Sequence, residues 1–133
     1  MAQPIIHLDT SFLIRALSAN SSEDRNLREW IAGGVKLAIS CIGWSEFLCG
    51  PLDAPQLALA VAIIGEPEPF ILEDSVLAVK LFNGSGRRRG SLIDCIIAAT
   101  AIRTGAGLAT SNREDFKRFP GLRLEPSQPT RRS

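Results

Sequence analysis

Short, mostly apolar runs alternate along this chain with longer segments in which apolar residues recur at helical spacing. Such runs are typical of strands that are buried on both faces, and they occupy residues 5–8, 35–40, 69–72, 107–110 and 122–125. Helices are predicted between them, over residues 12–17, 42–48, 54–64 and 115–119, between Ser21 and Gly33, from Glu73 to Phe82 and from Ser91 to Gly105.

The alternation of strands and helices predicts the fold class. Parallel strands need crossover connections, which are right-handed and usually contain a helix. We therefore expect an α/β fold with three layers (α/β/α) around a central, mostly parallel sheet of about five strands. No internal repeat interrupts this pattern, so a single domain is expected over residues 1–125, followed by a flexible tail over residues 126–133.

The composition adds limits but no substrate. A chain of 133 residues with 45% hydrophobic residues fills one core, and a net charge of +1 means that any nucleic-acid site must be a local patch. The three cysteines form no CxxC pair and there is one histidine, so no zinc site is indicated and buried thiols are expected. Neither a signal peptide nor a membrane span is indicated, and we expect a cytoplasmic protein.

Acidic residues stand where parallel sheets form ligand sites, just beyond the carboxyl ends of strands. Asp9 directly follows the first predicted strand, and Glu46 lies in the short helix after the second. Asp94 lies in the first turn of the helix that leads into the fourth strand. That strand is followed by three further candidates, Thr110, Asn112 and Asp115. Four acids are therefore expected to face one cleft.

Asp94 raises the question of what compensates its charge, because residues 91–100 include no Lys, Arg or His. Two carboxylates about 4 Å apart repel by about 4 kcal/mol at an effective dielectric constant of about 20. Acids that share a cleft therefore need a divalent cation or bound protons. Oxygen ligands suit hard cations, so we expect Mg²⁺, with Mn²⁺ as the alternative, at Asp9, Glu46, Asp94 and Asp115.

Each acid also has an ordinary structural interpretation. Asp9 and Asp115 are possible helix caps, Glu46 is a possible surface acid, and Asp94 suits the first turn of a helix because of the helix dipole. Thr110 and Asn112 are candidates for orienting substrate, ligands or water, although ordinary turn chemistry also explains them.

A basic run stands directly before the helix of the third acid, between two glycines, and consists of Arg87, Arg88 and Arg89. A charge run is most often a solvated loop. Beside an acidic pocket, however, guanidinium groups suit a phosphate backbone, so these arginines are candidates for binding substrate. Trp30 and Trp44 are possible stacking surfaces for bases, with core packing as the favoured use.

The sequence resembles the PIN-domain ribonucleases, and most closely the short VapC-like toxins of bacterial toxin–antitoxin pairs. The stretch IIHLDTSFLI resembles the opening strand of the family with Asp9, and AISCIGWSEFLCG resembles the segment of the second acid, Glu46. The stretch SLIDCIIAATAIRTGAGLATSNREDF resembles the segment of the third acid, Asp94, and the closing T-x-N-x-x-D-F turn. The likeness extends from Ile5 to about Leu124.

The resemblance implies a metal-dependent endoribonuclease that hydrolyses RNA phosphodiester bonds, with Asp9, Glu46 and Asp94 as the catalytic metal-site acids. It also implies a homodimer that a small cognate antitoxin holds inactive. Some relatives carry an acid where Asn112 stands, and here only Asp115 is nearby. We therefore expect one firmly held ion, with a second one recruited together with substrate.

The helix over residues 54–64 is apolar on almost every side. A helix with so little polar surface should be covered, so we expect it at a dimer or antitoxin interface, with burial inside the monomer as the alternative.

Other function classes fit the acids less well. A phosphotransfer enzyme of the haloacid-dehalogenase type needs a second Asp where Ser11 stands, and a response-regulator receiver needs paired acids at the first strand. A catalytically inactive domain that binds RNA or a partner protein is the main alternative to the ribonuclease.

Overall fold

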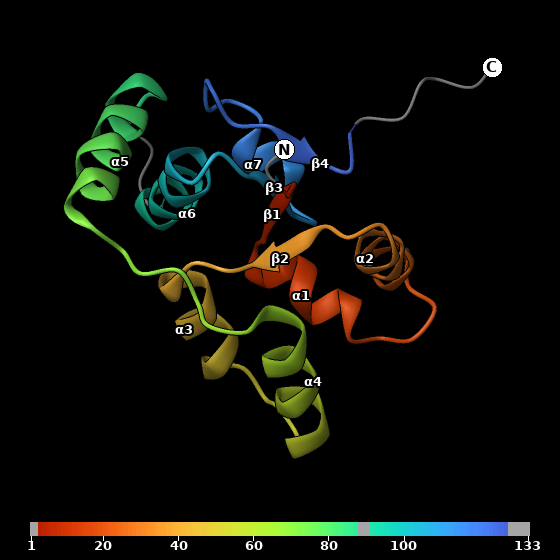
Figure 1. The fold of residues 1–133 in the computed structure, drawn as a ribbon. Coiled ribbons are helices and arrows are strands. Elements are labelled where there is room, and N and C mark those ends of the chain that lie inside the picture. The colour runs from red at the N-terminus through yellow and green to blue at the C-terminus, as the bar shows by residue number, and fades with distance from the viewer. Residues whose placement is uncertain (1–2, 88–90, 128–133) are drawn as a thin grey trace.

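The central sheet of the protein is parallel (Figure 1). The computed structural model describes residues 3–87 and 91–127, and within these ranges the sheet has four strands in the order β2-β1-β3-β4. The strands are β1 (Ile5–Leu8), β2 (Lys36–Ala38), β3 (Gly107–Ala109) and β4 (Leu124–Glu125). β1 is a central strand, with Ile6 opposite Leu37 on one side and Gly107 on the other.

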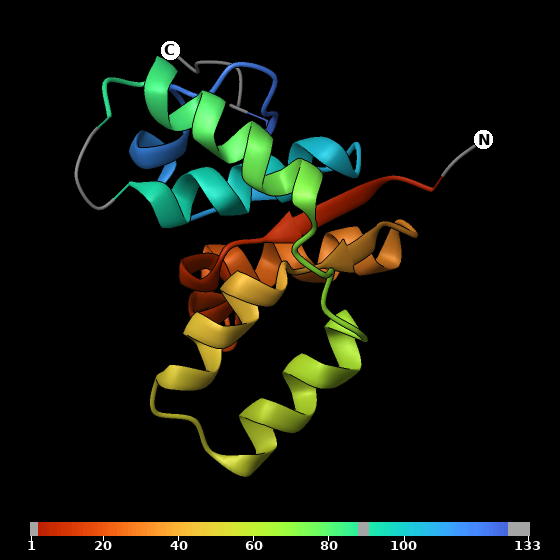
Figure 2. The same ribbon diagram turned by 90° about the vertical axis from the view of Figure 1, so that its left-hand side faces the viewer.

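Helices cover both faces of the sheet (Figures 1 and 2). Side chains alternate along a strand, so Ile6 and Leu8 pack into one core with the first four helices, whereas Leu108 packs into a second core with the other three. This confirms the predicted three-layer α/β fold. The helices are α1 (Thr10–Ala16), α2 (Ser22–Ala32), α3 (Cys41–Cys49), α4 (Ala54–Ile64), α5 (Leu72–Gly84), α6 (Leu92–Arg103) and α7 (Arg113–Phe116).

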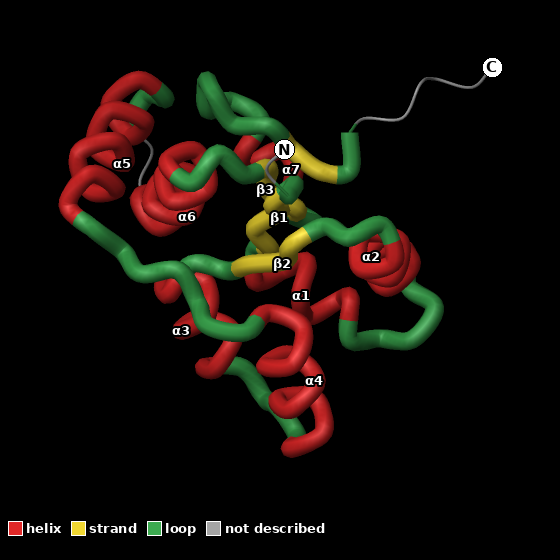
Figure 3. The backbone as a smooth tube through the Cα atoms, viewed as in Figure 1, coloured by secondary structure: helices red, strands yellow, loops and turns green. Residues whose placement is uncertain are grey.

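The strand predicted over residues 69–72 does not form, and that prediction is wrong. Figure 3 draws the connection between α4 and α5 as a loop. Only Glu68 pairs with the sheet there, through a bridge in which its N–H donates to Ile39 O and its C=O accepts from Cys41 N, both at 2.8 Å. Pro67 and Pro69 flank Glu68 and have no N–H to donate, so the ladder cannot continue.

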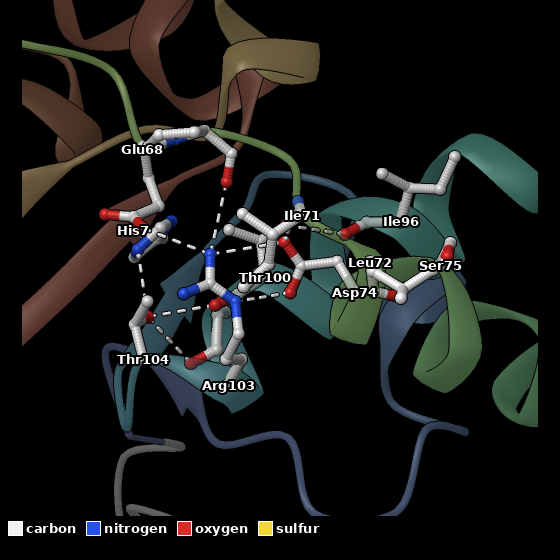
Figure 4. Close-up of polar contacts among 12 residues, drawn as sticks. His7, Glu68, Ile71, Leu72, Asp74, Ser75, Ile96, Thr100, Arg103 and Thr104 are labelled. Carbon is white, nitrogen blue, oxygen red and sulfur yellow. Dashed lines mark hydrogen bonds and ion pairs between the residues drawn. The ribbon is translucent and has the colours of Figure 1, made fainter.

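A buried polar cluster joins β1, α5 and α6 (Figure 4). The Asp74 carboxylate is 0% exposed and accepts from Arg103 Nε at 2.6 Å, and Arg103 Nη2 also donates to Glu68 Oε2 at 3.1 Å. Beside this ion pair, Thr104 Oγ1 lies 3.2 Å from Nε2 of the buried His7. Arg103 therefore fixes the end of α6 to the start of α5 and to the loop before it.

The helix α4 is only partly covered. It begins with a capping box, in which Gln56 N donates to Asp53 Oδ1 at 2.8 Å and Asp53 N donates to Gln56 Oε1 at 3.1 Å. Its buried side packs into the first core, while Leu57, Leu59 and Val61 remain 36%, 51% and 49% exposed. Complete burial of α4 within this chain, the alternative raised by the sequence, is therefore wrong.

The cysteines and the tryptophan Trp30 test two further predictions. All three cysteines are free, but Cys49 is exposed, so the expectation of buried thiols is wrong for this residue. Trp30 stacks on Phe12 with ring centroids 5.5 Å apart and contributes to the first core, as the favoured interpretation predicted. Within the described ranges, no helix has both the length and the apolarity to cross a bilayer.

The Arg103 ion pair generates a stability prediction. The substitution Arg103→Met leaves the Asp74 carboxylate buried and unpaired, so we expect the free energy of unfolding to fall by about 3 to 5 kcal/mol. Urea unfolding followed by tryptophan fluorescence measures this loss. The matched control is Arg28→Met, because Arg28 is 76% exposed in its pair with Asp24, and its loss should stay below about 1 kcal/mol. Equal losses in the two variants would contradict the role assigned to Arg103.

His7 generates a prediction about pH. Burial, together with the charges of Arg103 and Lys36, lowers the pKa of His7 to about 4 against the opposing charges of Glu68 and Asp74. The unfolded chain binds this proton at a pKa of about 6.5, so the stability that neutral His7 contributes is complete above that pH and decreases as pH falls toward about 4. Over this window we expect the free energy of unfolding of wild type to fall by about 3 kcal/mol more than that of His7→Gln. Urea unfolding at each pH measures the two values. Parallel pH curves would contradict this expectation.

Candidate active site

Acidic side chains from three elements line one cavity beyond the carboxyl ends of the strands. Asp9 follows β1, Glu46 lies in α3 after β2, and Asp94 lies in the first turn of α6. The cavity has a volume of about 300 Å³, and Asn112 also lines it. The structure thus brings together three of the four acids singled out in the sequence, as the strand-end rule for parallel sheets predicts.

Asp9 is held by hydroxyl groups rather than used as a cap. It occupies the N-cap position of α1, but its side chain makes no capping hydrogen bond. Instead, its Oδ2 accepts from Ser11 Oγ at 2.9 Å and from Thr110 Oγ1 at 2.8 Å. Asn112 N donates to Thr110 Oγ1 at 2.9 Å, which fixes that hydroxyl in turn. The carboxylate is 6% exposed and is directed toward the turn between β3 and α7.

Glu46 reaches the cavity from an exposed position on α3. Thr10 Oγ1 lies 2.8 Å from Gly43 O and 3.2 Å from Glu46 Oε1, so this hydroxyl connects α1 to α3 beside the acid. Partial burial and the charge of Asp9 raise the pKa of Glu46, and the hydrogen bond from Thr10 opposes the rise. An added Cβ at Gly43 would lie 3.2 Å from Ile39 Cγ1, so the glycine allows α3 to pack closely here.

Asp94 has the most perturbed carboxyl group of the site. Burial raises its pKa to about 6, the charges of Asp115 and Asp9 add to the rise, and Arg118 opposes it. Asp115 lies in α7 and does not line the cavity, but its charge acts on Asp94. It is not the cap of α7, because Asn112 holds that position without a side-chain capping bond. Several carboxylates therefore act on Asp94, and the positive charge of Arg118 offsets their effect only in part.

Sequence reasoning missed Arg118. Burial raises the pKa of both Asp94 and Cys95, and the positive charge of Arg118 opposes the rise in each. Its Nη1 donates to Asp115 O at 2.5 Å, and its guanidinium carbon lies 4.6 Å from the centroid of the Phe119 ring. The only signal in the sequence was a basic residue three positions after Asp115, which looks the same as a surface charge.

The basic loop is only partly described. Arg87 donates to Asn83 Oδ1 and lies over the Phe82 ring, with its guanidinium carbon 5.4 Å from the ring centroid. It therefore packs on the end of α5 and does not line the acid cavity. Arg88 and Arg89 lie outside the described residues.

The donor set determines which metal ions fit. Within residues 3–87 and 91–127, no three His, Cys, Asp or Glu side chains converge closely enough to enclose an ion by themselves. The groups that line the cavity offer only oxygen ligands for a hard cation. Mg²⁺ is commonly bound by one or two carboxylates while it keeps several waters. The cavity therefore fits a Mg²⁺ ion that keeps some of its waters better than an ion that is bound by protein ligands alone.

Comparison with known proteins places the chain in a family. The family model for the PIN domain matches residues 6–122. A chain in the crystal structure of VapBC2 from Rickettsia felis, bound to a promoter DNA fragment, is 27% identical, with 91% of this chain and 97% of that chain covered and a TM-score of 0.75. A toxin–antitoxin complex from Klebsiella pneumoniae gives 27% identity, coverage of 88% and 94%, and a TM-score of 0.70.

A third structure shares the fold alone. VapC20 from Mycobacterium tuberculosis, described as a sarcin–ricin loop cleaving toxin, is 16% identical, with coverage of 89% and 98% and a TM-score of 0.61. The predicted resemblance to VapC-like PIN-domain proteins is confirmed by these matches. With its parallel sheet, its acids at the strand ends and a family match over nearly its whole length, the chain belongs to the PIN domain family.

Proposed function

We propose that this protein is a metal-dependent endoribonuclease and the toxin of a toxin–antitoxin pair. The observation that carries the proposal is the set of Asp9, Glu46 and Asp94 around one cavity, where crowding and burial raise the pKa of Asp94 to about 6. A divalent cation removes the repulsion that this arrangement creates. The family match and the fold shared with toxin–antitoxin complexes support the same assignment.

In this proposal Asp9 and Asp94 would hold Mg²⁺, or Mn²⁺, with Glu46 as a further ligand from the same cavity. Asp115 does not line the cavity and would add its negative charge from α7. Such an ion would supply an activated water and would neutralise charge on the phosphoryl oxygens. Ser11 and Thr110 fix the orientation of Asp9 before substrate arrives, because both donate to its Oδ2. A second ion is recruited with the substrate.

Glu46 is the proposed proton acceptor. The pKa of Glu46 is raised toward the pH at which the enzyme works, and this suits a group that must bind and release a proton. Its exposed position on α3 leaves it in contact with water at the mouth of the cavity. Thr10 fixes its orientation through the contact at 3.2 Å.

The RNA backbone is bound at the rim of the cavity in this scheme. Asn112 lines the cavity and can orient the strand. Thr110 is buried and does not line this cavity, so its part is to position Asp9 and Asn112 through its hydrogen bonds. The arginines Arg87, Arg88 and Arg89 follow α5 and precede α6, the helix of Asp94, and their guanidinium groups suit phosphate oxygens. We place the reaction in the cytoplasm.

Two uncovered apolar faces support a homodimer and a cognate antitoxin as partners. One is the α4 face with Leu57, Leu59 and Val61. The other is the α5 face, where Leu72, Val76 and Val79 are 78%, 58% and 52% exposed. Apolar surface of this kind is typical of interaction sites, and two separate faces allow both partners to bind at once.

Catalysis provides the first test of the proposal. A mixed RNA pool is incubated with wild type, Asp9→Asn and Asp94→Asn, with Mg²⁺ or with EDTA. We expect EDTA to abolish cleavage and each substitution to lower its rate about 100-fold or more, because direct metal ligands matter at least as much as the groups that orient them. Glu114→Gln is the matched control, since Glu114 is 83% exposed in its surface pair with Lys117 and should keep full activity.

Another outcome would favour the main alternative. If wild type binds RNA equally well with and without Mg²⁺ and Asp94→Asn binds it unchanged, with no cleavage in either protein, the chain is a catalytically inactive binding domain.

Light scattering tests the partner faces. We expect wild type to be a dimer and Leu59→Glu to be a monomer or to lose antitoxin binding, because the substitution places a charge on the exposed α4 face. Val79→Glu is the matched variant on the α5 face and reports which face serves which partner. A monomeric wild type would refute the homodimer.

A further inference from the structure

A second cavity adjoins the acid cavity on the other side of the turn between β3 and α7. Its volume is about 280 Å³, and Thr110, whose hydroxyl holds Asp9, is part of its wall. Other groups that line it are Phe12, Glu23, Asn26, Ser111 and Arg113. Thr110 and Ser111 line the second cavity and Asn112 lines the acid cavity, so consecutive residues of one turn border both. An RNA with a phosphodiester at the acids can therefore place a neighbouring nucleotide in the second cavity.

Glu23 is a fixed, ionised acceptor in this second cavity. Ser111 Oγ donates to Glu23 Oε2 at 2.8 Å, and Ser22 Oγ donates to Glu23 Oε1 at 3.1 Å. Burial raises the pKa of Glu23, but these hydrogen bonds, a backbone hydrogen bond and the charge of Arg15 together outweigh burial and lower it overall. An ionised carboxylate accepts hydrogen bonds and donates none, so this side of the cavity selects a ligand with N–H donors.

The other lining groups complement Glu23. The side-chain amide of Asn26, one helical turn further along α2, forms no hydrogen bond with another residue in the part of the chain that the structure describes. Arg113 uses Nη1 to donate to Pro126 O at 3.0 Å, and its other side-chain N–H groups have no hydrogen-bond partner among residues 3–87 and 91–127. Phe12 is 2% exposed and gives the cavity a rigid apolar base.

An acceptor, an amide and a guanidinium above an apolar base are the groups that recognise the edge of a nucleobase in single-stranded RNA. A phosphate group is the less suitable occupant, because the negative charge of Glu23 repels it. The free N–H groups of Asn26 and Arg113 supply the donors that a base carbonyl needs.

We propose that this cavity binds the base of the nucleotide next to the cleaved bond and selects guanine through Glu23. This proposal rests on the ribonuclease function proposed above. Guanine presents two N–H donors, N1–H and N2–H₂, beside its O6 acceptor. Glu23 accepts from the donors while Arg113 or Asn26 donates to O6. Adenine, cytosine and uracil each present a single donor group on the same edge, so they match this set of groups less well.

Sequencing of cleavage products tests the selection. A randomised RNA pool is cleaved in Mg²⁺, and the bases next to the new ends are counted. We expect wild type to enrich guanine about tenfold at one flanking position, the size of one good bidentate contact. The variant Glu23→Gln keeps an acceptor for Ser111 but loses the charge, so its enrichment should fall close to one. Glu29→Gln, an exposed residue of the same helix outside the cavity, should keep the wild-type enrichment.

Equilibrium binding separates the two proposals. Labelled RNA pentamers that differ only in the central base are titrated into Asp94→Asn, with and without Glu23→Gln, and thermal unfolding checks that each variant is folded. Guanine-dependent binding that Glu23→Gln removes supports the subsite even if wild type cleaves no RNA, in which case the ribonuclease proposal alone fails. Cleavage with no base preference, or a guanine preference that Glu23→Gln leaves intact, overturns the subsite alone.

Discussion

Repulsion between carboxylates at one edge of the parallel sheet is the constraint that gives this chain its chemistry. Asp9 lies at the end of a strand and Asp94 lies at the start of a helix. Both elements pack into the cores of the protein, which hold the two acids in place. Burial is the largest cause of the raised pKa of Asp94, and the charges of Asp115 and Asp9 add to the rise. A fold optimised for stability alone would not place acids this way, because each further charge adds to the cost of ionising its neighbours.

The same molecule also shows how a buried acid is compensated by a side chain, without a metal ion. Asp74 is fully buried, but Arg103 donates to both of its oxygens, at 2.6 and 3.2 Å, and Ile71 N donates to one of them. Near Asp94, the cation is Arg118, which forms no ion pair with it among the described residues. One acid is thus part of the structural framework, whereas the other remains available to a ligand.

The turn between β3 and α7 connects these properties to substrate. Through Thr110 it holds Asp9, and through Ser111 it contacts Glu23 on α2. Ser111 N also donates to Ser11 Oγ at 3.2 Å, so the turn is fixed to α1 as well as to α2. One short segment therefore sets the positions of Asp9, the proposed metal ligand, and of Glu23, the proposed base-binding residue.

The sequence by itself determined the layered α/β fold, six of the seven helices in the described part of the chain, the strand-end position of Asp9 and the helix-start position of Asp94, because apolar runs and helix-start residues act locally. The last helix lies at Arg113–Phe116 rather than at 115–119. Only the tertiary structure decided that residues 69–72 form no strand, that Arg118 acts on Asp94, and that Glu23 contacts Ser111. Such contacts join segments far apart along the chain, and periodicity carries no information about which distant side chains will meet.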